Sequence, residues 1–552
     1  MESDGKIGNL SKARRERLVA EVGAIRAYLE KSADTNATRL LKFAAELEKE
    51  VLGKKYGLVF EEHRERVDVE LDENLPVLKE VKNRFVSRGD AEARSLNFLI
   101  EGDNLAALKL LEKTHRGKID LIYIDPPYNT GNRDFIYNDS YVDKTDTFRH
   151  SKWLSFMKKR LEIARRLMSD KGVIFISIDD NEQATLKLLC DEVLGEGNFI
   201  VNMIWKSKSG GGGDVSQIAT DHEYVLAYAK QIANAKIGND MEASVTTVYN
   251  HEDEYGRYSL DRLDKQSLGY QTSLDFPIKG PDGKTYVVHH KDPKIKKARW
   301  RWGKDTVAER YDELVFIYPY VYTKNYEKKD GQKPRSVLFD ERFGRTRTGS
   351  TDLRKVIGNQ VIFTYPKPVA LLKYLIEIGS GDNTTILDFF AGSGTTGHAV
   401  MKLNAEDGGK RKFILVTNNE NEICEKVTYE RLKRVIEREN YAAALKYYRI
   451  DYVPIGEDGY WDLADKLLGH IRELVELENG IDFAHDRSVA IILRDEEIDS
   501  FMKKLTPKGK VRILYKGHNV MLGGKVKSAL AKRGIEVRTI PDYYYPELEG
   551  GR

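Results

Sequence analysis

The chain has 552 residues, 41% hydrophobic and 32% charged, and its formal net charge at pH 7 is only +3. This composition is that of a folded protein and excludes a disordered chain, while the length predicts roughly three or four domains. The two cysteines, Cys190 and Cys424, are too few for a disulfide framework or a cysteine-rich zinc site, and we predict no metal centre. Because the net charge is nearly balanced, charged partners must be sought in local clusters.

The N-terminal segment MESDGKIGNLSKARRERL contains no apolar run of signal-peptide length. No later stretch is long and apolar enough to span a bilayer. We therefore expect a cytoplasmic protein without a membrane partner.

The first segments of the chain differ in periodicity. Apolar residues at helical spacing, such as Leu18, Val22 and Ile25, predict an amphipathic helical region within residues 1–55. We expect this region to pack on the rest of the protein or on a partner. Residues 56–95 show no clear period and are interpreted as a connector.

From residue 96 onward, short apolar runs alternate with amphipathic stretches, which is typical of a doubly wound, mostly parallel α/β sheet. The predicted strands in this part are 98–100, 119–124, 172–178, 198–205 and 224–229, and the predicted helices are 104–111 and 153–168. The same alternation of predicted helices and strands returns later, with helices 367–378 and 395–403 and strands 384–390 and 413–417.

An interruption separates these two parts. Residues 241–350 are rich in tyrosine, tryptophan, arginine and lysine and have little helical periodicity. We interpret them as an insert that divides one α/β domain into halves at 96–240 and 351–452. The tail, 453–552, alternates again (SVAIILR, VRILYK, IEVRTI) and predicts a small separate α/β module.

The first stretch that carries chemistry is KIDLIYIDPPY, where an apolar strand ends in Asp125, Pro126, Pro127 and Tyr128. Proline has no N–H and ends a sheet ladder. The Asp125 carboxylate and the Pro126 carbonyl can accept hydrogen bonds from an amine, and the Tyr128 ring offers a face for stacking. The combination predicts a site for a planar ring that bears an exocyclic amino group. The alternative is a proline-terminated strand with a capping aspartate.

The second stretch is DFFAGSGTTG, in which a predicted strand ends in glycines and leads into a helix. Glycines allow a ligand to approach the backbone, and a helix N-terminus favours an anionic group. The next predicted strand, FILVTNNE, ends near Glu420, where a carboxylate could bind ribose hydroxyls. Together these features indicate a cofactor that contains a nucleoside, although a tight turn and a surface acid are the alternatives.

The two stretches resemble a known family. Asp-Pro-Pro-Tyr followed far downstream by Phe-x-Gly-x-Gly is similar to the amino-methyltransferases that modify DNA bases, and the order of the motifs resembles their β group. The resemblance extends from about Leu96 to Val427 and includes EGDNL, GVIFISIDDNE, HEYVLAYAK, FTYPKPVALL and FILVTNNENEICEKV. With YGLVFEE near Tyr56 and the long tail, the chain is similar to the modification subunits of type III restriction–modification systems.

This resemblance implies a Rossmann-like, S-adenosylmethionine-dependent fold with an inserted target-recognition domain. It places the catalytic motif on Asp125, Pro126, Pro127 and Tyr128. The residues that it implies for cofactor binding are Asp103, Lys367, Asp388, Phe389, Phe390, Gly392, Gly394 and Glu420. Within that set, Asp103 would contact the cofactor's adenine, Glu420 the ribose and Lys367 the carboxylate. By default, Asp103 and Lys367 would be ordinary surface charges.

The implied reaction is direct methyl transfer to N6 of an adenine that is flipped out of the duplex. In the family, an aspartate as the first motif residue points to adenine. Neither cysteine lies in a proline–cysteine loop, which argues against cytosine-C5 methylation. Two alternatives remain open: cytosine-N4 methylation by the same machinery, and a DNA-recognition subunit that mainly recruits a nuclease.

The insert is the expected place for double-stranded DNA binding. In KDPKIKKARWRWGK, cations alternate with Trp300 and Trp302, and GRTRTGS adds two arginines. Such cations would contact phosphates or read guanine edges, although a solvated basic hairpin is the simpler alternative. The predicted DNA-binding residues are Lys297, Arg299, Arg301, Lys304, Arg345 and Arg347.

Partner proteins are predicted from the resemblance. It implies a homodimer and a possible helicase–nuclease restriction subunit, for which the helical N-terminus and the C-terminal module are candidate contacts. The stretch GPDGKTY has Ile278 where a phosphate-binding loop would begin with glycine, so we interpret it as a Pro-Asp-Gly turn. ATP hydrolysis and DNA cleavage would then belong to the restriction subunit.

Overall fold

The computed structural model forms two compact units, Met1–Ile237 with Arg335–Arg552, and Gly238–Pro334. It describes residues 10–32, 36–52, 57–60, 65–89, 95–131, 136–137, 140–210, 217–243, 248–292, 294–327, 331–359, 363–455, 466–484, 486–505, 511–540 and 544. Within these ranges, none of the helices is both long and apolar enough to cross a membrane.

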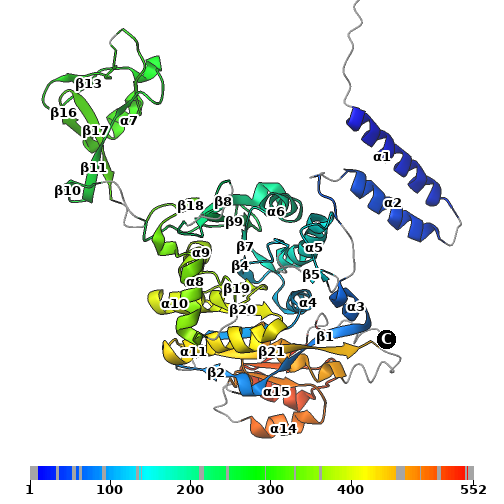
Figure 1. Ribbon diagram of the computed structural model, residues 1–552. Coiled ribbons are helices and arrows are strands. Elements are labelled where there is room, and N and C mark those ends of the chain that lie inside the picture. Colours follow the sequence, from blue (N-terminus) through cyan, green and yellow to red (C-terminus); the bar gives the residue numbers. More distant parts are fainter. Residues whose placement is uncertain are drawn as a thin grey trace, which may run out of the picture. The chain divides into compact units, whose positions relative to one another are not determined.

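An 11-stranded mixed sheet forms the centre of the larger unit (Figure 1). Ten of the strands lie in the order β1 (Asn74–Glu80), β21 (Ala443–Pro454), β3 (Ser95–Glu101), β20 (Lys412–Thr417), β19 (Thr385–Asp388), β4 (Ile119–Ile124), β7 (Met168–Ile178), β9 (His222–Ala229), β8 (Phe199–Lys206) and β18 (Val337–Leu338), and the eleventh, β2 (Val86–Ser87), pairs with β21. From β21 to β7 neighbouring strands are parallel, whereas β9 is antiparallel to both of its neighbours. The predicted doubly wound, mostly parallel α/β class is confirmed.

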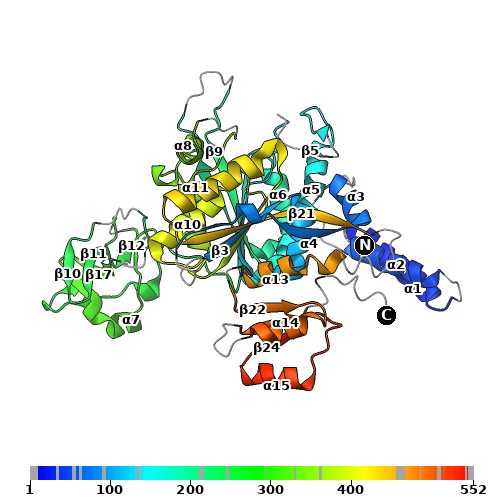
Figure 2. The ribbon, with the colours of Figure 1, turned by 90° about the horizontal axis from the view of Figure 1, so that it is seen from below.

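Helices cover both faces of this sheet (Figure 2). Alternate residues of β4 point to opposite faces: Ile122 and Ile124 pack in one core, and Leu121 and Tyr123 pack in the other. Burial on both faces explains why parallel strands appear in the sequence as continuous apolar runs. One core contains α4 (Asn104–His115), α5 (Arg149–Leu167), α6 (Gln183–Cys190) and α13 (Ile471–Asn479), and the other contains α8 (Thr346–Ile357), α9 (Val369–Gly379), α10 (Thr395–Asp407) and α11 (Glu430–Arg438).

The segment before the sheet differs from the expected connector at 56–95. It forms α3 (Arg66–Glu73), β1 and β2 (Val86–Ser87), and both strands pair with β21. Because β1 is an edge strand, Pro76 is tolerated in it. Farther upstream, α1 (Leu10–Leu29) and α2 (Ala37–Leu52) contact each other through an Arg26–Glu48 ion pair of 2.7 Å.

The smaller unit is built on its own antiparallel sheet of β10 (His251–Asp253), β11 (Gly256–Arg262), β17 (Tyr320–Tyr326) and β16 (Leu314–Ile317). Two short two-stranded sheets, β12 (Asp264–Lys265) with β15 (Arg299–Trp300) and β13 (Ile278–Lys279) with β14 (Thr285–Tyr286), complete it with α7 (Lys304–Glu309). The β13–β14 turn has Gly283 at φ +76°, as a Pro-Asp-Gly turn requires. This unit ends at Pro334, earlier than the boundary expected at 350, because β18 already pairs with β8 of the large sheet.

The C-terminal part has a three-stranded parallel sheet of β22 (Val489–Ile492), β23 (Ile513–Lys516) and β24 (Glu536–Thr539), with helices α14 (Glu497–Lys504) and α15 (Gly524–Lys532). Its preceding helix, α13, packs in the core of the large sheet. A buried cation strengthens that contact: Lys446 of β21 lies 2.6 Å from Glu476 and 2.8 Å from Asp482. The Lys446 side chain is only 1% exposed.

We expect Lys446→Met to destabilise the protein by about 3 kcal/mol or more, because it leaves buried carboxylates without their cation. Lys79→Met is the matched control, since Lys79 pairs with Asp451 at 3.6 Å in an exposed position and should cost about 1 kcal/mol or less. Chemical denaturation of both variants measures the difference. Equal midpoints for the two variants would contradict the structural role of Lys446.

Candidate functional site

The loop after β4 is held in a fixed shape by α5 and by a buried carboxylate. The indole N–H of Trp153 donates to the Pro127 carbonyl at 2.7 Å. Asn129 is buried at φ +56° and donates from Nδ2 to Glu182 Oε1 at 2.5 Å. A left-handed backbone is tolerated by asparagine better than by most residues. The loop that carries Asp125 and Tyr128 is therefore held by hydrogen bonds at Pro127 and Asn129.

Four polar side chains meet at this loop. Lys367 Nζ lies 2.9 Å from each carboxylate oxygen of Asp125 and donates to the Tyr128 hydroxyl at 2.8 Å. The Tyr128 hydroxyl donates to Glu223 Oε2 at 3.0 Å, and Lys367 Nζ lies 3.3 Å from the same oxygen. Lys367 is 9% exposed and Asp125 is 27% exposed. The structure thus brings two of the four predicted residues of the loop, Asp125 and Tyr128, together with Lys367, which is 242 residues away from Asp125 in the chain.

The charges of this cluster shift each other's protonation. Burial raises the pKa of the Asp125 carboxyl, and the Lys367 ammonium only partly opposes that shift. Burial alone would lower the pKa of Lys367, but Asp125 and Glu223 raise it above its ordinary value. Lys367 therefore stays a cation between two acidic side chains.

The glycine loop follows β19, in the same sheet and next to β4. Asp388 accepts hydrogen bonds from the Phe390 N–H at 3.0 Å and from the Thr396 hydroxyl at 2.5 Å. Burial raises the pKa of its carboxyl to about 7, and the nearby Asp125 adds to the shift. Gly392 and Gly394 have φ values of +47° and +75°, a conformation that favours glycine.

A cavity of about 80 Å³ joins the two loops. Its lining combines the Lys367 cation and two carboxyl groups with the rings of Phe363 and Phe390. It also includes Gly392, where a Cβ would come within 3.0 Å of the Phe363 ring. A charged amino-acid end and a flat base would suit these groups, so the residues fit S-adenosylmethionine. Ligand pockets usually hold about 300 Å³ or more, so the cavity accommodates part of such a molecule.

Asp103 occupies the N-cap of α4, where its carboxylate accepts from the Leu105 N–H at 2.7 Å. Behind it, buried Arg160 donates to Asn104 Oδ1 at 2.6 Å and forms an ion pair with Glu65 at 2.9 Å. Asn104 in turn donates to the Phe389 carbonyl at 3.1 Å. This chain of contacts ties the Asp103 turn to the end of β19.

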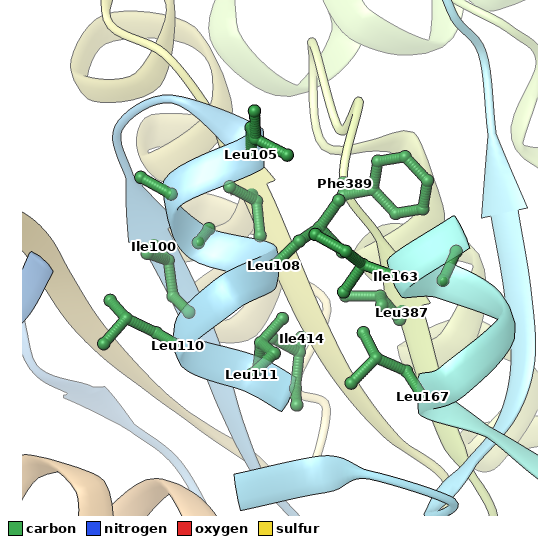
Figure 3. Close-up of a cluster of buried hydrophobic side chains, with 14 of the residues drawn as sticks. Ile100, Leu105, Leu108, Leu110, Leu111, Ile163, Leu167, Leu387, Phe389 and Ile414 are labelled. Atoms are coloured by element: carbon green, nitrogen blue, oxygen red, sulfur yellow. The ribbon is translucent and has the colours of Figure 1, made fainter. Parts of the chain in front are cut away.

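Four of the predicted cofactor residues, Asp103, Phe389, Gly394 and Glu420, are not among the residues that line the cavity. The Phe389 ring is fully buried among Leu108, Ile163 and Leu387 in the core (Figure 3), so its side chain does not line the cavity. Glu420 is exposed in a short helical turn, Glu420–Glu422, after β20. Its role as a ribose-binding acid stays a prediction.

The predicted DNA-binding cations fall into both units. Lys297 and Lys304 are exposed in the smaller unit, whereas Arg299 donates to Gln271 at 2.6 Å. Arg301 is paired with Asp261 at 3.2 Å and donates to the Thr323 hydroxyl at 2.6 Å. The intervening Trp300 belongs to the core, so part of this basic stretch stabilises the unit itself.

Arg345 and Arg347 lie in the larger unit. The Arg345 guanidinium donates to the Asp340, Gly344 and Phe339 carbonyls at 3.0, 3.0 and 2.7 Å. These backbone contacts fix the turn before α8, which is a structural role. Arg347 is exposed on α8.

Two residues of the site, Glu223 and Arg431, were not predicted from the sequence. Glu223 stands in HEYVLAYAK, a stretch that resembles the family, but nothing there indicated contact with Tyr128. Arg431 is fully buried on α11 and donates to the Thr395 hydroxyl at 2.7 Å and to Ser393 Oγ at 3.1 Å, behind the glycine loop. Burial lowers the pKa of its guanidinium to about 10. Its position on the same stripe as apolar Val435 was an available signal.

Comparison with known proteins finds one matching family model and several proteins of similar sequence. A family model described as DNA methylase matches residues 119–430. The Mod subunit of the type III restriction–modification enzyme EcoPI from Escherichia phage P1 is 35% identical over 380 aligned residues, and the match covers 59% of this chain and 58% of that protein. The type II methyltransferase M.KpnI from Klebsiella pneumoniae is 37% identical over 337 aligned residues, and the match covers 58% of this chain and 79% of that protein.

A solved structure, the cytosine-N4-specific PvuII DNA methyltransferase, covers 64% of this chain and 95% of its own at 12% identity and a TM-score of 0.33. The chain spans somewhat more than half the length of the EcoPI relative. The predicted resemblance to type III modification subunits is confirmed by the sequence matches. Since the family model covers more than half of the 552 residues, the chain belongs to the DNA methylase family.

Proposed function

We propose that this protein is a site-specific DNA methyltransferase that transfers a methyl group from S-adenosylmethionine to N6 of a flipped adenine. The observation that carries the proposal is the shared cavity between the Asp125 loop and the Gly392 loop. One loop has the groups that would hold an aromatic amine, and the other has the glycine turn that would hold the methyl donor. Membership of the DNA methylase family supports the same reaction.

In this proposal each residue of the Asp125 loop acts on the base. Tyr128 stacks on the ring of the flipped adenine, while the Asp125 carboxylate and the Pro126 carbonyl accept the hydrogens of its amino group. Asp125 also stabilises the positive charge that develops on the nitrogen. The anchors Trp153 and Asn129 keep these groups in place, so that catalysis depends mainly on positioning.

We assign cofactor binding to residues on both sides of the cavity. S-adenosylmethionine supplies an electrophilic methyl group on a sulfonium. Gly392 and Phe390 line the cavity and would hold it beside Asp125, and Gly394 would shape the turn behind them. Lys367 also lines the cavity, but its ammonium is bonded to Asp125 and Tyr128, so its predicted pairing with the cofactor carboxylate is not part of this proposal. Asp103 and Glu420 would contact the adenine and the ribose.

The direct test is transfer of labelled methyl from S-adenosylmethionine to DNA by the purified chain, followed by analysis of the modified nucleosides. We expect N6-methyladenine and no modified cytosine. Label found in N4-methylcytosine would show that the protein methylates cytosine N4 and would reject the assignment to adenine. No transfer to any DNA would reject the enzyme function. Sequencing of the modified DNA would identify the target site.

We also propose that the chain is the modification and recognition subunit of a type III restriction–modification system. The names of the EcoPI, StyLTI and EcoP15I relatives, all type III Mod subunits, support this assignment. The proposed assembly is a homodimer that binds double-stranded DNA and a helicase–nuclease partner, in the cytoplasm where cellular DNA is modified. Light scattering of the purified chain and a pull-down from the native host would test the dimer and the partner separately.

For DNA binding, we predict that Lys297→Ala with Lys304→Ala weakens affinity about equally for all sequences. Each exposed lysine that contacts a phosphate releases counterions, so the slope of log affinity against log salt should fall by about 1 per lysine. Fluorescence anisotropy over a salt series measures this slope. Lys279→Ala is a control because Lys279 is another exposed lysine of the same unit. An unchanged slope in the double variant would remove these two lysines from the interface.

A further inference from the structure

The Lys367 ammonium is bonded to the Asp125 carboxylate, the same group that would bind the amino group of the base in the proposed function. An ammonium has three hydrogens, and those of Lys367 are directed to the two Asp125 oxygens and the Tyr128 hydroxyl. In this arrangement Asp125 is engaged on both oxygens. Each carboxylate oxygen can accept a second hydrogen bond, so an adenine amino group would first share Asp125 with Lys367 and would have the carboxylate to itself only after Lys367 has moved.

The backbone of Lys367 is held tightly, so the movement must come from the side chain. Pro366 and Pro368 flank the residue and restrict its backbone angles. Helix α8 is also pressed against this segment, since a Cβ on Gly349 would lie 1.9 Å from the Pro366 carbonyl oxygen. Rotation about the long lysine side chain remains available.

Glu223 is the nearby group that can receive the ammonium. Its Oε2 is 3.3 Å from Lys367 Nζ and already accepts the Tyr128 hydroxyl at 3.0 Å. Its side chain is 17% exposed. A buried ammonium that loses its carboxylate partner is strongly destabilised. A second carboxylate within reach removes most of that destabilisation.

We propose that Glu223 is a positioning residue that takes over the Lys367 ammonium when the amino group of the target base binds Asp125. The proposal rests on the proposed function and adds a residue to it. Lys367 neutralises Asp125 before the base binds, and Glu223 keeps the lysine paired after the exchange. The Tyr128 hydroxyl stays bonded to Glu223 throughout, so the stacking ring keeps its orientation.

The exchange depends on the amino group and can be tested with a base that lacks it. We would measure binding of DNA with adenine, or with unsubstituted purine, at the target position found by sequencing, in the presence of S-adenosylhomocysteine. Unsubstituted purine has no amino group to bind Asp125, so Lys367 should stay paired with Asp125 when purine DNA binds. Glu223→Gln should therefore weaken binding of adenine DNA by about tenfold and leave purine DNA and S-adenosylhomocysteine binding unchanged.

Asp180→Asn is the matched control, because Asp180 is an exposed carboxylate on the segment after β7 that accepts the Tyr224 hydroxyl at 2.9 Å. This variant should bind both DNAs as the unmodified protein does. Equal weakening for adenine and purine DNA in Glu223→Gln, or no weakening, overturns the proposal. Weaker S-adenosylhomocysteine binding also overturns it, since the lysine would then act on the cofactor. Methyl transfer by the unmodified protein is scored separately, so failure of the enzyme function is recognised on its own.

Discussion

Asp125→Ala is expected to lower kcat for methyl transfer by about 10²–10³-fold, the usual cost of removing one group that stabilises a transition state. The carboxylate would hold the amino group in line with the methyl donor and stabilise charge on the nitrogen. The apolar residues of the strand before Asp125 are buried, and Trp153 anchors the loop beyond it, so we expect neither Glu223 nor Asp388 to take its place. The measurement is single-turnover transfer of labelled methyl to DNA.

Asp125→Asn is the informative comparison for this variant. The amide retains one acceptor oxygen but no charge, so its rate should lie between those of the alanine variant and the unmodified protein. Calorimetry with S-adenosylhomocysteine should show cofactor affinity within a few-fold of the unmodified protein in both variants. Turnover that survives in Asp125→Ala would exclude the proposed role of this carboxylate.

Gly392→Val is expected to reduce cofactor affinity by about 10²-fold. A β-branched residue is strained at the φ of +47° found here, and its Cβ would lie 3.0 Å from the Phe363 ring. Both Gly392 and Phe363 line the cavity, so the substitution changes the wall that would face the methyl donor. Calorimetric titration with S-adenosylhomocysteine measures the loss.

Gly381→Val provides the matched control on the segment before β19. A Cβ there would meet only Thr384, at 3.8 Å, which is an ordinary contact. This variant should bind the cofactor as the unmodified protein does. Thermal melting of both proteins separates a local change at the cavity from unfolding. Comparable cofactor affinity in the two variants would argue against the glycine loop as the binding site.

Several local elements could be predicted from the sequence. The run Ile119–Ile124 is a strand with the predicted bounds, because a strand buried on both faces must be apolar at successive positions. Pro126 and Pro127 end it for a reason that lies within the residues themselves. The glycine turn at Gly392 and Gly394 was predictable in the same way, since its positive φ values follow from local chemistry.

Side-chain direction was harder to predict. Phe389 and Phe390 are neighbours in the chain, yet the first ring lies in the core and the second lines the cavity. Arg301 and Arg345 belong to basic stretches that suggested DNA contacts, but their guanidinium groups are bonded to Thr323 and to backbone carbonyls. Composition gives the number of cations in a segment and does not show which of them have partners within the fold.

By itself, the sequence determined the α/β class, the two loops that carry the chemistry and their order along the chain, because apolar period, proline and glycine act locally. The tertiary structure alone decided that Lys367 bonds Asp125 and that Glu223 joins Tyr128, contacts that span 242 and 95 residues. Such contacts depend on the order of strands in the sheet and on the packing of α8 against the lysine segment. Strand order is set by the burial of many side chains at once, so no single stretch of sequence contains it.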